Sequence, residues 1–303
     1  MRHKNTFGDY VFNTALTLFM LILTVLVIYP FLNSLAISLN DSLDTARGGI
    51  SIVPRIFTLR NYELIFQNSK IYTAYYITIA RTLVGTALSL FATMLFAFGM
   101  AHANLKGRRV YTMLTLIPMY FGGGLIPYYF LIRQLGLLNN FWVYIIPMIV
   151  NIWEMILMRS YFQSLPSALE ESARIDGANA FTVLFRIIAP LSMPIIATII
   201  LFVGVMHWNA WFDAAIFITK RQDLKPMQSV LLSIISEARF AESIAKTAAG
   251  RSADLSNIAR RRNVNVRSIT MATMIVTILP IVCVYPFLQR YFIKGIMIGS
   301  IKG

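Results

Sequence analysis

The sequence predicts an all-α integral membrane protein with six transmembrane helices and a short helical element between the fourth and the fifth. Of the 303 residues, 57% are hydrophobic and only 13% are charged, whereas about a quarter of the residues of soluble domains are charged. The apolar residues also fall into long uncharged blocks, and a helix needs about 20 residues to cross the hydrocarbon core of a bilayer. A lipid bilayer is therefore the expected surroundings for most of this chain.

Six blocks supply the predicted spans. They are expected at residues 11–32, 72–101, 110–132, 140–158, 194–217 and 269–288. The first is a run of Leu, Ile, Val, Phe and Thr that ends near Pro30, and the second contains one charge, Arg81. The third is interrupted by Pro118, the glycines at 122–124 and Pro127, so we expect a kinked or partly unwound helix. The last three are apolar runs separated by polar connections.

Basic residues bear on the orientation of the chain. An even number of spans puts both termini on one side, and the two tails and the basic turn at residues 106–109 make that side cytoplasmic by the positive-inside rule. The segment from Lys220 to Ser268 lies on the opposite side and is more basic than any other connection, so charge alone leaves the orientation open. The net charge of +14 is spread over loops between spans, so no nucleic-acid partner is expected.

Residue types that carry catalysis or bind metals are scattered along the chain. The three histidines, His3, His102 and His207, lack zinc spacing, and no pair of carboxylates is placed for acid and base chemistry. The glycines at 122–124 lack the following Lys and Ser or Thr of a phosphate-binding loop. Cys283 is the single cysteine. We expect no catalytic residue, metal or cofactor in this chain.

The polar segment at residues 160–193 predicts two short helices joined by a sharp turn. Ser167 and Glu170, after a proline, form a capping box that begins the first helix. Gly177 ends that helix, because glycine adopts the left-handed conformation without penalty. The second helix stops at Pro190 and is predicted from apolar residues at i, i+3, i+4 and i+7. These residues are Phe181, Leu184, Phe185 and Ile188.

This segment resembles the signature of the permease subunits of bacterial binding-protein-dependent ABC importers. That signature reads Glu-Ala-Ala, three residues, Gly, nine residues, Ile, one residue, Leu-Pro. The matching positions are Glu171, Ser172, Ala173, Gly177, Ile187 and Pro190, with Ser172 in place of the first alanine and Ala189 in place of the leucine. The resemblance covers most of the chain and looks most like the carbohydrate-uptake branch, especially its type for complex oligosaccharides.

The resemblance implies a cytoplasmic coupling helix that lies in a groove of an ATP-binding subunit. Glu171 would face a basic group of that subunit, and Gly177 would make the turn. The other residues that it assigns to this contact are Ser172, Ala173, Arg174, Asp176, Phe181, Leu184, Phe185, Ile187 and Pro190.

The same resemblance implies the partners and the location. The partners are a second permease, most simply a homologous chain in a heterodimer, two cytoplasmic ATP-binding subunits and an extracytoplasmic solute-binding protein. ATP and Mg would be held by the ATP-binding subunits and not by this chain. The chain would be a multi-pass protein of the bacterial plasma membrane, and alternating access would carry the solute between the two permeases.

A solute path is expected along the fifth span. Trp208 and Phe212 are four residues apart, as are Asn209 and Asp213, so each pair would share a helix face. Aromatic and polar faces of this kind suit sugar rings and hydroxyls. The alternative is that Trp208 and Trp211 lie in the aromatic belt at the outer interface.

Two ionisable residues within spans are further candidates for the path. Arg81 and Glu154 are costly in lipid, which favours a functional role, and the alternative is that each side chain extends from a span end to the interface. The basic segment from Lys220 to Ser268 would attract anionic solutes such as uronate-containing oligosaccharides. The alternative is a solvated loop that contacts the binding protein or lipid headgroups.

Other functions remain open from the residues alone. They are a permease of the same type for a non-sugar solute such as peptides, a secondary transporter and a membrane-embedded enzyme. A secondary transporter predicts an internal inverted repeat with broken helices and intramembrane acids, and the sequence shows no repeat. An enzyme would need polar catalytic groups clustered at one interface.

Overall fold

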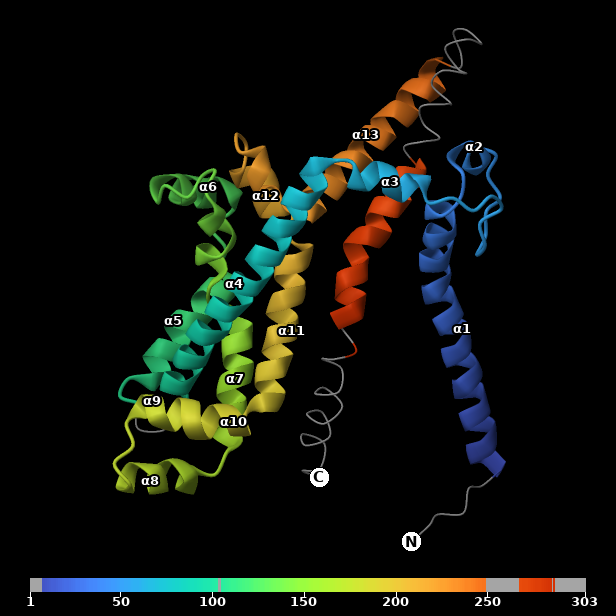
Figure 1. The fold of residues 1–303 in the computed structure, drawn as a ribbon. Helices are drawn as coiled ribbons and strands as arrows, with labels where there is room; N and C mark the ends of the chain where they lie inside the picture. Colours follow the sequence, from blue (N-terminus) through green and yellow to red (C-terminus); the bar gives the residue numbers. More distant parts are fainter. Residues whose placement is uncertain (1–6, 103–104, 249–266, 285, 287–303) are drawn as a thin grey trace. The chain divides into compact units, whose positions relative to one another are not determined.

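The computed structural model describes residues 7–102, 105–248, 267–284 and 286, and this part of the chain is predominantly helical (Figure 1). The elements are α1 (Phe7–Ser38), α2 (Ser42–Thr45), α3 (Arg60–Phe66), α4 (Ser69–Ala101), α5 (Arg108–Tyr120), α6 (Leu125–Gln134), η1 (Phe141–Tyr144), η2 (Ile146–Met148), α7 (Ile152–Ser164), α8 (Ser167–Ile175), α9 (Ala180–Val183), η3 (Leu184–Ile188), α10 (Ala189–Leu191), α11 (Met193–Asn209), α12 (Phe212–Phe217), η4 (Gln222–Leu224) and α13 (Met227–Ala248). A further helix, Arg267–Val284, lies beyond α13 in the sequence. Among the described residues the β contacts amount to an isolated bridge between Asn40 and Phe57. The prediction of an all-helical fold is confirmed.

The chain divides into two compact units. One consists of Met1–Ser69 and Leu231–Leu279, and the other of Lys70–Val230 and Pro280–Gly303. The second unit contains most of α4, all of α5 to α12 and every residue of the candidate site described below.

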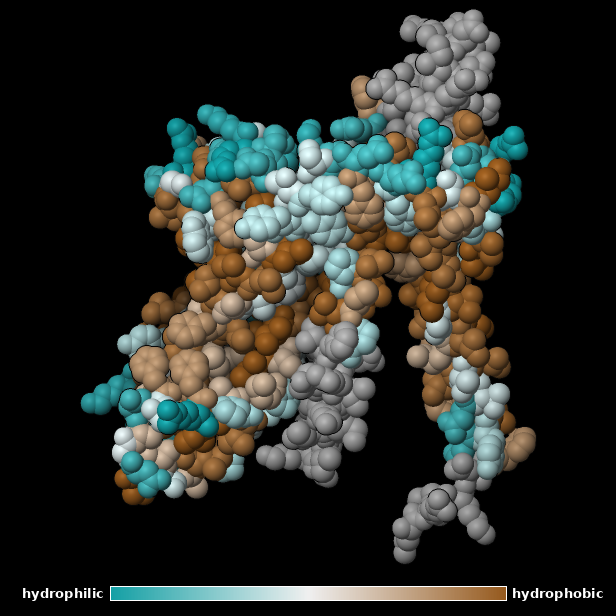
Figure 2. All heavy atoms as spheres, viewed as in Figure 1, coloured by the Kyte–Doolittle hydropathy of each residue, from teal (hydrophilic) through white to brown (hydrophobic). Residues whose placement is uncertain are grey.

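Three helices are long and apolar enough to cross a membrane. They are α1 with 32 residues, α4 with 33 residues and Arg267–Val284 with 18 residues. Three helix pairs pass the same test together but are bent, namely Arg108–Tyr120 with Leu125–Gln134 by 113°, Phe141–Met148 with Ile152–Ser164 by 48°, and Ala180–Leu191 with Met193–Asn209 by 87°. Within the described residues, length and composition thus allow three membrane-crossing helices, or up to six if each bent pair is one span. Hydrophobic side chains cover most of the visible surface of α1 in Figure 2, except at its lower end, as expected for a helix in apolar surroundings.

The first helix does not end near Pro30, contrary to the prediction. It begins at Phe7 and continues through Pro30 to Ser38. A proline inside a helix removes one backbone hydrogen bond. Ending the helix inside hydrocarbon would leave several backbone groups unsatisfied, which costs more.

The interruption of the third span is confirmed. Helix α5 ends at Tyr120 and α6 begins at Leu125, and the two axes differ by 113°. Gly124 lies between them with a φ of +82°. A residue with a Cβ atom would be strained there, so the glycine makes the break possible.

The fifth span is not the continuous helix that was predicted. Helix α11 ends at Asn209, Ala210 is extended with a ψ of 129°, and α12 begins at Phe212. Trp208 and Phe212 therefore do not share a helix face, and neither do Asn209 and Asp213, because the i,i+4 rule holds only within one helix.

The fourth span and the basic connection also differ from the prediction. The fourth begins with the short turns η1 and η2, and α7 continues beyond residue 158 to Ser164. Asn151 caps α7, since its Oδ1 atom accepts the backbone N–H of Trp153 at 2.9 Å. The segment from Lys220 to Ser268, predicted as a loop, contains η4 and the 22-residue helix α13. Its remaining basic cluster, the end of the predicted sixth span and the C-terminal tail lie outside the described residues.

Two apolar cores organise the second unit, and α4 contributes to both. The first core joins α4, α7, α8 to η3 and α11, and it consists of Met94, Ala97, Phe98, Met155, Met158, Phe162, Ala173, Val183, Leu184, Ile188, Ile196, Ile199 and Val203. The second joins α4, α6, η1 and α12, and it consists of Ile77, Ile132, Leu137, Val143, Tyr144, Ile145, Ala214, Phe217, Ile218 and Leu224. Helix α4 is thus packed at both ends.

A buried ion pair lies beside the second core. The Arg81 side chain is 1% exposed, and its Nη2 atom lies 2.5 Å from Oδ2 of Asp213. Its Nη1 atom donates to Oδ1 of Asp213 and to the carbonyl of Ala210, each at 3.2 Å. The guanidinium carbon lies 4.2 Å from the centre of the Tyr144 ring, and the Tyr144 hydroxyl donates to the carbonyl of Leu224 at 2.8 Å. These contacts join α4, η1 and α12.

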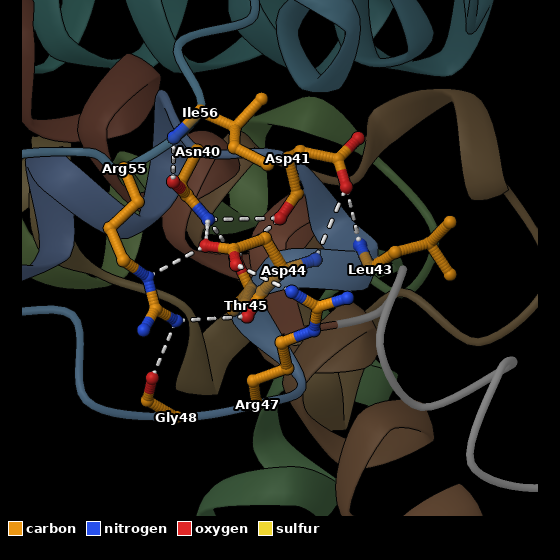
Figure 3. Close-up of polar contacts among 9 residues, drawn as sticks. All are labelled: Asn40, Asp41, Leu43, Asp44, Thr45, Arg47, Gly48, Arg55 and Ile56. Atoms are coloured by element: carbon orange, nitrogen blue, oxygen red, sulfur yellow. Dashed lines mark hydrogen bonds and ion pairs between the residues drawn. The ribbon is translucent and has the colours of Figure 1, made fainter.

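A polar cluster orders the connection between α1 and α3 in the first unit (Figure 3). Asn40 donates from Nδ2 to Oδ2 of Asp44 at 3.0 Å and accepts the N–H of Ile56 at its Oδ1 atom at 2.9 Å. Arg55 donates from Nε to Oδ2 of Asp44 at 2.9 Å and from Nη2 to the carbonyl of Gly48 at 2.7 Å. The hydrogen bond from Asn40, assisted by Arg55 and Arg47, holds the pKa of Asp44 below its ordinary value of 3.8.

We predict that order in this connection depends on the charge of Asp44. Because its folded-state pKa is depressed, the stabilisation is present above the ordinary pKa and is lost as the pH falls through the folded value. Pepsin, which is active in acid, should cut residues 43–57 in the wild type only below about pH 3.8. Asp44→Asn should be cut at every acidic pH, and equal cleavage of the two proteins at pH 4 to 5 would contradict the prediction.

We predict that single substitutions in the buried ion pair are strongly destabilising. Asp213→Asn leaves the Arg81 charge without its counterion, which should cost about 3–5 kcal/mol. The measurement is thermal unfolding in detergent. The double variant Arg81→Met with Asp213→Leu should be more stable than Asp213→Asn, because it removes both charges. A double variant as unstable as the single one would show that the pairing is not the cause.

Candidate functional site

The segment between α7 and α11 folds as a helical hairpin, here called the connecting hairpin (residues 167–191). It consists of α8, a tight turn, and the continuous helical run α9, η3 and α10 (Figure 1). The turn is a Schellman motif: the N–H of Ala178 donates to the carbonyl of Ala173 at 2.9 Å, and that of Gly177 to Arg174 at 3.1 Å. Gly177 has a φ of +84°. The predicted helix, turn and helix are therefore present.

The start of the hairpin differs from the predicted capping box. Ser167 is the first helical residue, and the residue before it, Pro166, makes no side-chain cap. Glu170 bonds elsewhere: its Oε1 atom lies 2.6 Å from Nε2 of His102 and 2.7 Å from Nη2 of Arg174. The carboxylate that was predicted to close the cap instead joins α8 to the end of α4.

The second half of the hairpin is capped by Asn179 and passes through a π-helical turn. The Oδ1 atom of Asn179 accepts the N–H of Thr182 at 2.9 Å. The turn η3 spans five residues, and the N–H of Ala189 bonds to the carbonyl of Leu184. The wider turn accommodates Pro190, which has no N–H of its own, so the helix ends one residue after Pro190 and not at it.

One side of the hairpin is buried in the first core and the other is exposed. Ala173 and Leu184, 7% and 1% exposed, pack inside the chain, so the predicted use of Leu184 as an apolar contact for a partner is wrong. Its role is to anchor the hairpin. Ile175 and Phe181 are 86% and 63% exposed. The remaining predicted residues on the exposed side are Glu171, Ser172, Arg174, Asp176, Gly177, Phe185 and Pro190, with Ile187 partly buried.

The break between α11 and α12 lies beside two cavities. The first has a volume of about 200 Å³ and is lined by Tyr128, Val143, Met148, Asn209, Ala210, Trp211, Phe212, Asp213 and Phe217. The second has a volume of about 620 Å³ and is lined by Gly122, Gly123, Gly124, Leu125, Pro127, Tyr128, Leu131 and Phe212. They share Tyr128 and Phe212 and therefore adjoin. Aromatic walls with a few polar groups are typical of ligand sites.

Five of the six predicted path residues fall into three groups. Asn209, Trp211 and Asp213 line the smaller cavity. Trp208 is 9% exposed and lines a different, apolar cavity of about 490 Å³ between α4, α11 and residues 280–284. Arg81 is held by Asp213.

Glu154 does not join this ion pair. It is 4% exposed, and its Oε2 atom has no hydrogen-bond partner among the residues that the structure describes.

Sequence reasoning missed two residues of the site. His102 contacts Glu170 across 68 positions of sequence, and Tyr128 belongs to both cavities. Ser167, Glu170 and the glycine signalled the hairpin through local spacing, but no local pattern signals a contact between distant helices. Pairing of the histidine with an acid is visible only in three dimensions.

Comparisons with known proteins agree with this architecture. No family model matches the chain. It is 33% identical over 285 residues to the polygalacturonan/rhamnogalacturonan transport system permease protein YtcP of Bacillus subtilis, covering 94% of this chain and 96% of that protein. It is 36% identical over 301 residues to protein LplC of the same organism, covering 99% and 97%.

Among solved structures, the chain is similar to one from a bacterial ABC transporter involved in the import of the acidic polysaccharide alginate. The TM-score is 0.83 at 27% identity, and the match covers 95% of this chain and 99% of that one. The chain therefore belongs to the permease proteins of ABC transport systems and is an integral protein of the plasma membrane.

Proposed function

We propose that this chain is a six-span permease that forms half of the translocation pathway for a sugar or oligosaccharide in an ABC importer. A homologous permease supplies the other half, and an extracytoplasmic solute-binding protein delivers the solute. Two cytoplasmic subunits bind and hydrolyse ATP with Mg. Membership of the permease family supports this general assembly and disfavours a secondary transporter or a membrane enzyme.

The observation that carries the proposal is the two-sided connecting hairpin. Its inner side is anchored in the core by Ala173 and Leu184, whereas Ile175, Phe181 and Glu171 are exposed. Large apolar side chains on a polar surface favour a protein contact. This face suits a groove of an ATP-binding subunit that presents apolar residues and one basic group.

The hairpin can act as the coupling element because it is stiff. The Schellman turn satisfies the last carbonyls of α8, and Ala173 and Leu184 hold the inner side of the hairpin in the first core. When the two ATP-binding subunits close on ATP, they would draw two such hairpins together and open the pathway outward. Hydrolysis and separation would then reverse the movement and release the solute inward.

The two adjoining cavities are the proposed solute-facing surface. Trp211, Phe212 and Tyr128 offer aromatic faces for sugar rings, and Asn209 is exposed and available to hydroxyl groups. Arg81 and Asp213 neutralise each other next to this surface, so their role is to hold the wall rather than to bind solute.

Relatives support a carbohydrate as the solute. Their names specify polygalacturonan or rhamnogalacturonan and, for the solved structure, the acidic polysaccharide alginate. An acidic oligosaccharide also fits the net charge of +14.

Uptake measured in competition should therefore be reduced more by uronate-containing oligosaccharides than by neutral ones, and the opposite order would contradict an acidic solute.

We predict that the hairpin surface governs association with the ATP-binding subunits. Glu171→Ala should weaken that association by about 2–5 kcal/mol, because the basic group opposite is left buried and unpaired. Copurification from membranes measures the effect. Glu63→Ala, an exposed acid on α3, is the matched control. Unchanged copurification of Glu171→Ala would remove the coupling assignment.

We predict that Trp211 contributes to solute affinity. Removing one aromatic face by Trp211→Ala should cost about 1 kcal/mol, which is about a fivefold increase in the apparent KM for uptake. Trp142 has a similar exposure, 44% against 42%, and does not line either cavity. Trp142→Ala is therefore the control and should leave the KM unchanged. Equal effects of the two substitutions would argue against a solute site here.

A further inference from the structure

His102 lies where the end of α4 meets the connecting hairpin. It directly follows Ala101, the last residue of α4, and its ring packs edge-on against Phe98 with the ring centres 4.7 Å apart. Phe98 in turn contacts Phe162 of α7 at 6.5 Å. The side chain of Gln163 donates to the carbonyl of Ala101 at 3.4 Å. These contacts hold the imidazole against the end of α4, and none of them involves the hairpin.

The two ring nitrogens of His102 make different contacts. Nδ1 lies 2.9 Å from the carbonyl oxygen of Phe98, and a carbonyl can only accept, so Nδ1 carries a proton. Nε2 lies 2.6 Å from Oε1 of Glu170. The same nitrogen lies 3.0 Å from Nη2 of Arg174. The ring therefore presents its Nε2 edge to the charged side chains of α8.

Arg174 completes the junction from the hairpin side. Its Nε and Nη2 atoms lie 3.0 and 2.7 Å from Oε1 of Glu170, and its Nη2 atom lies 3.0 Å from Nε2 of His102. The Glu170 carboxylate therefore lies between the imidazole of His102 and the guanidinium of Arg174, one from each element. The next residue, Glu171, is exposed. Adjacent acids on α8 thus have separate contacts, one inside the chain and one left for a partner.

Helix α4 continues from this junction to the buried ion pair. It runs without a proline from Ser69 to Ala101, so Arg81 lies about 30 Å along the helix axis from His102. Arg81 binds Asp213 and the carbonyl of Ala210, both of which line the smaller cavity. A single helix therefore contacts the hairpin at one end and the cavity wall at the other.

We propose that His102 is a positioning residue that fastens the connecting hairpin to α4, so that movement of the hairpin reaches the wall of the solute cavity. The inference rests on the proposed coupling function and adds a specific route for it. Without the contact between His102 and Glu170, the hairpin still binds the ATP-binding subunits through Glu171. Movement of the hairpin then displaces Arg81 and the break at Ala210 less than in the wild type.

The test uses the complete importer, with its solute-binding protein, reconstituted in liposomes. The quantity measured is solute imported per ATP hydrolysed. His102→Ala should lower this ratio about fivefold or more, while the ATP-binding subunits still copurify. Glu170→Gln, which keeps the side-chain volume and removes the charge, should lower the ratio similarly. His102→Gln should recover part of the ratio, because its amide can donate to Glu170.

The double variant His102→Ala with Glu170→Gln identifies the contact itself. If the two residues act through each other, the double variant should be no worse than the poorer single variant. Multiplied losses in the double variant, or an unchanged ratio in His102→Ala, would overturn the proposal. If His102→Ala does not fold, Glu170→Gln and His102→Gln decide the question, and an unchanged ratio in Glu170→Gln would overturn it.

Failure of this inference is separable from failure of the proposed function. Glu171→Ala tests association with the ATP-binding subunits. If Glu171→Ala loses this association but His102→Ala imports a normal amount of solute per ATP, only the proposed role of His102 is rejected. Retention of the association in Glu171→Ala would instead reject the coupling assignment of the hairpin.

Discussion

The arrangement of this permease depends on how broken helices satisfy their backbone inside a bilayer. Hydrocarbon offers no hydrogen bonds, so every interruption of a helix must find partners within the protein. At the break between α11 and α12, the carbonyl of Ala210 accepts from Arg81, whose charge is neutralised by Asp213. One long side chain from α4 thus permits an irregular backbone at the place where the cavity wall forms. A continuous helix would need no such partner and would offer no cavity.

At the other end of α4, two neighbouring acidic residues of α8 differ in what they contact. Successive residues of an α-helix point about 100° apart, so Glu170 and Glu171 face different directions. Glu170 joins His102 and Arg174 within the chain, and Glu171 is exposed. Two neighbouring acids in the sequence therefore have different consequences, one for the position of the hairpin and one for its surface. The buried side chains of the hairpin hold α8 in one orientation, so the two acids keep their different directions.

The parts of the fold that follow from local patterns were predictable. Uncharged apolar blocks indicated the long helices, the glycines at 122–124 indicated the break in the third span, and Gly177 indicated the hairpin turn. The break at Ala210 was not predictable, because the flanking residues include neither proline nor glycine. It depends on Arg81, which is 129 positions away in the sequence. The burial of Leu184 was missed for a related reason, since spacing shows which residues share a face but not what that face meets.

The π-helical turn η3 sets the direction in which the exposed face of the hairpin points relative to α11. A π-turn holds one residue more than an α-helical turn over the same path, and each residue of an α-helix accounts for about 100° of rotation. Loss of one residue within Leu184–Ile188 would convert it to ordinary helix and turn Phe181 about a quarter of the way around the axis relative to α11. Single-residue length changes at this turn would therefore re-aim the exposed face of the hairpin without altering its side chains. A related permease with such a length change would present the same contact residues to an ATP-binding subunit of a different shape.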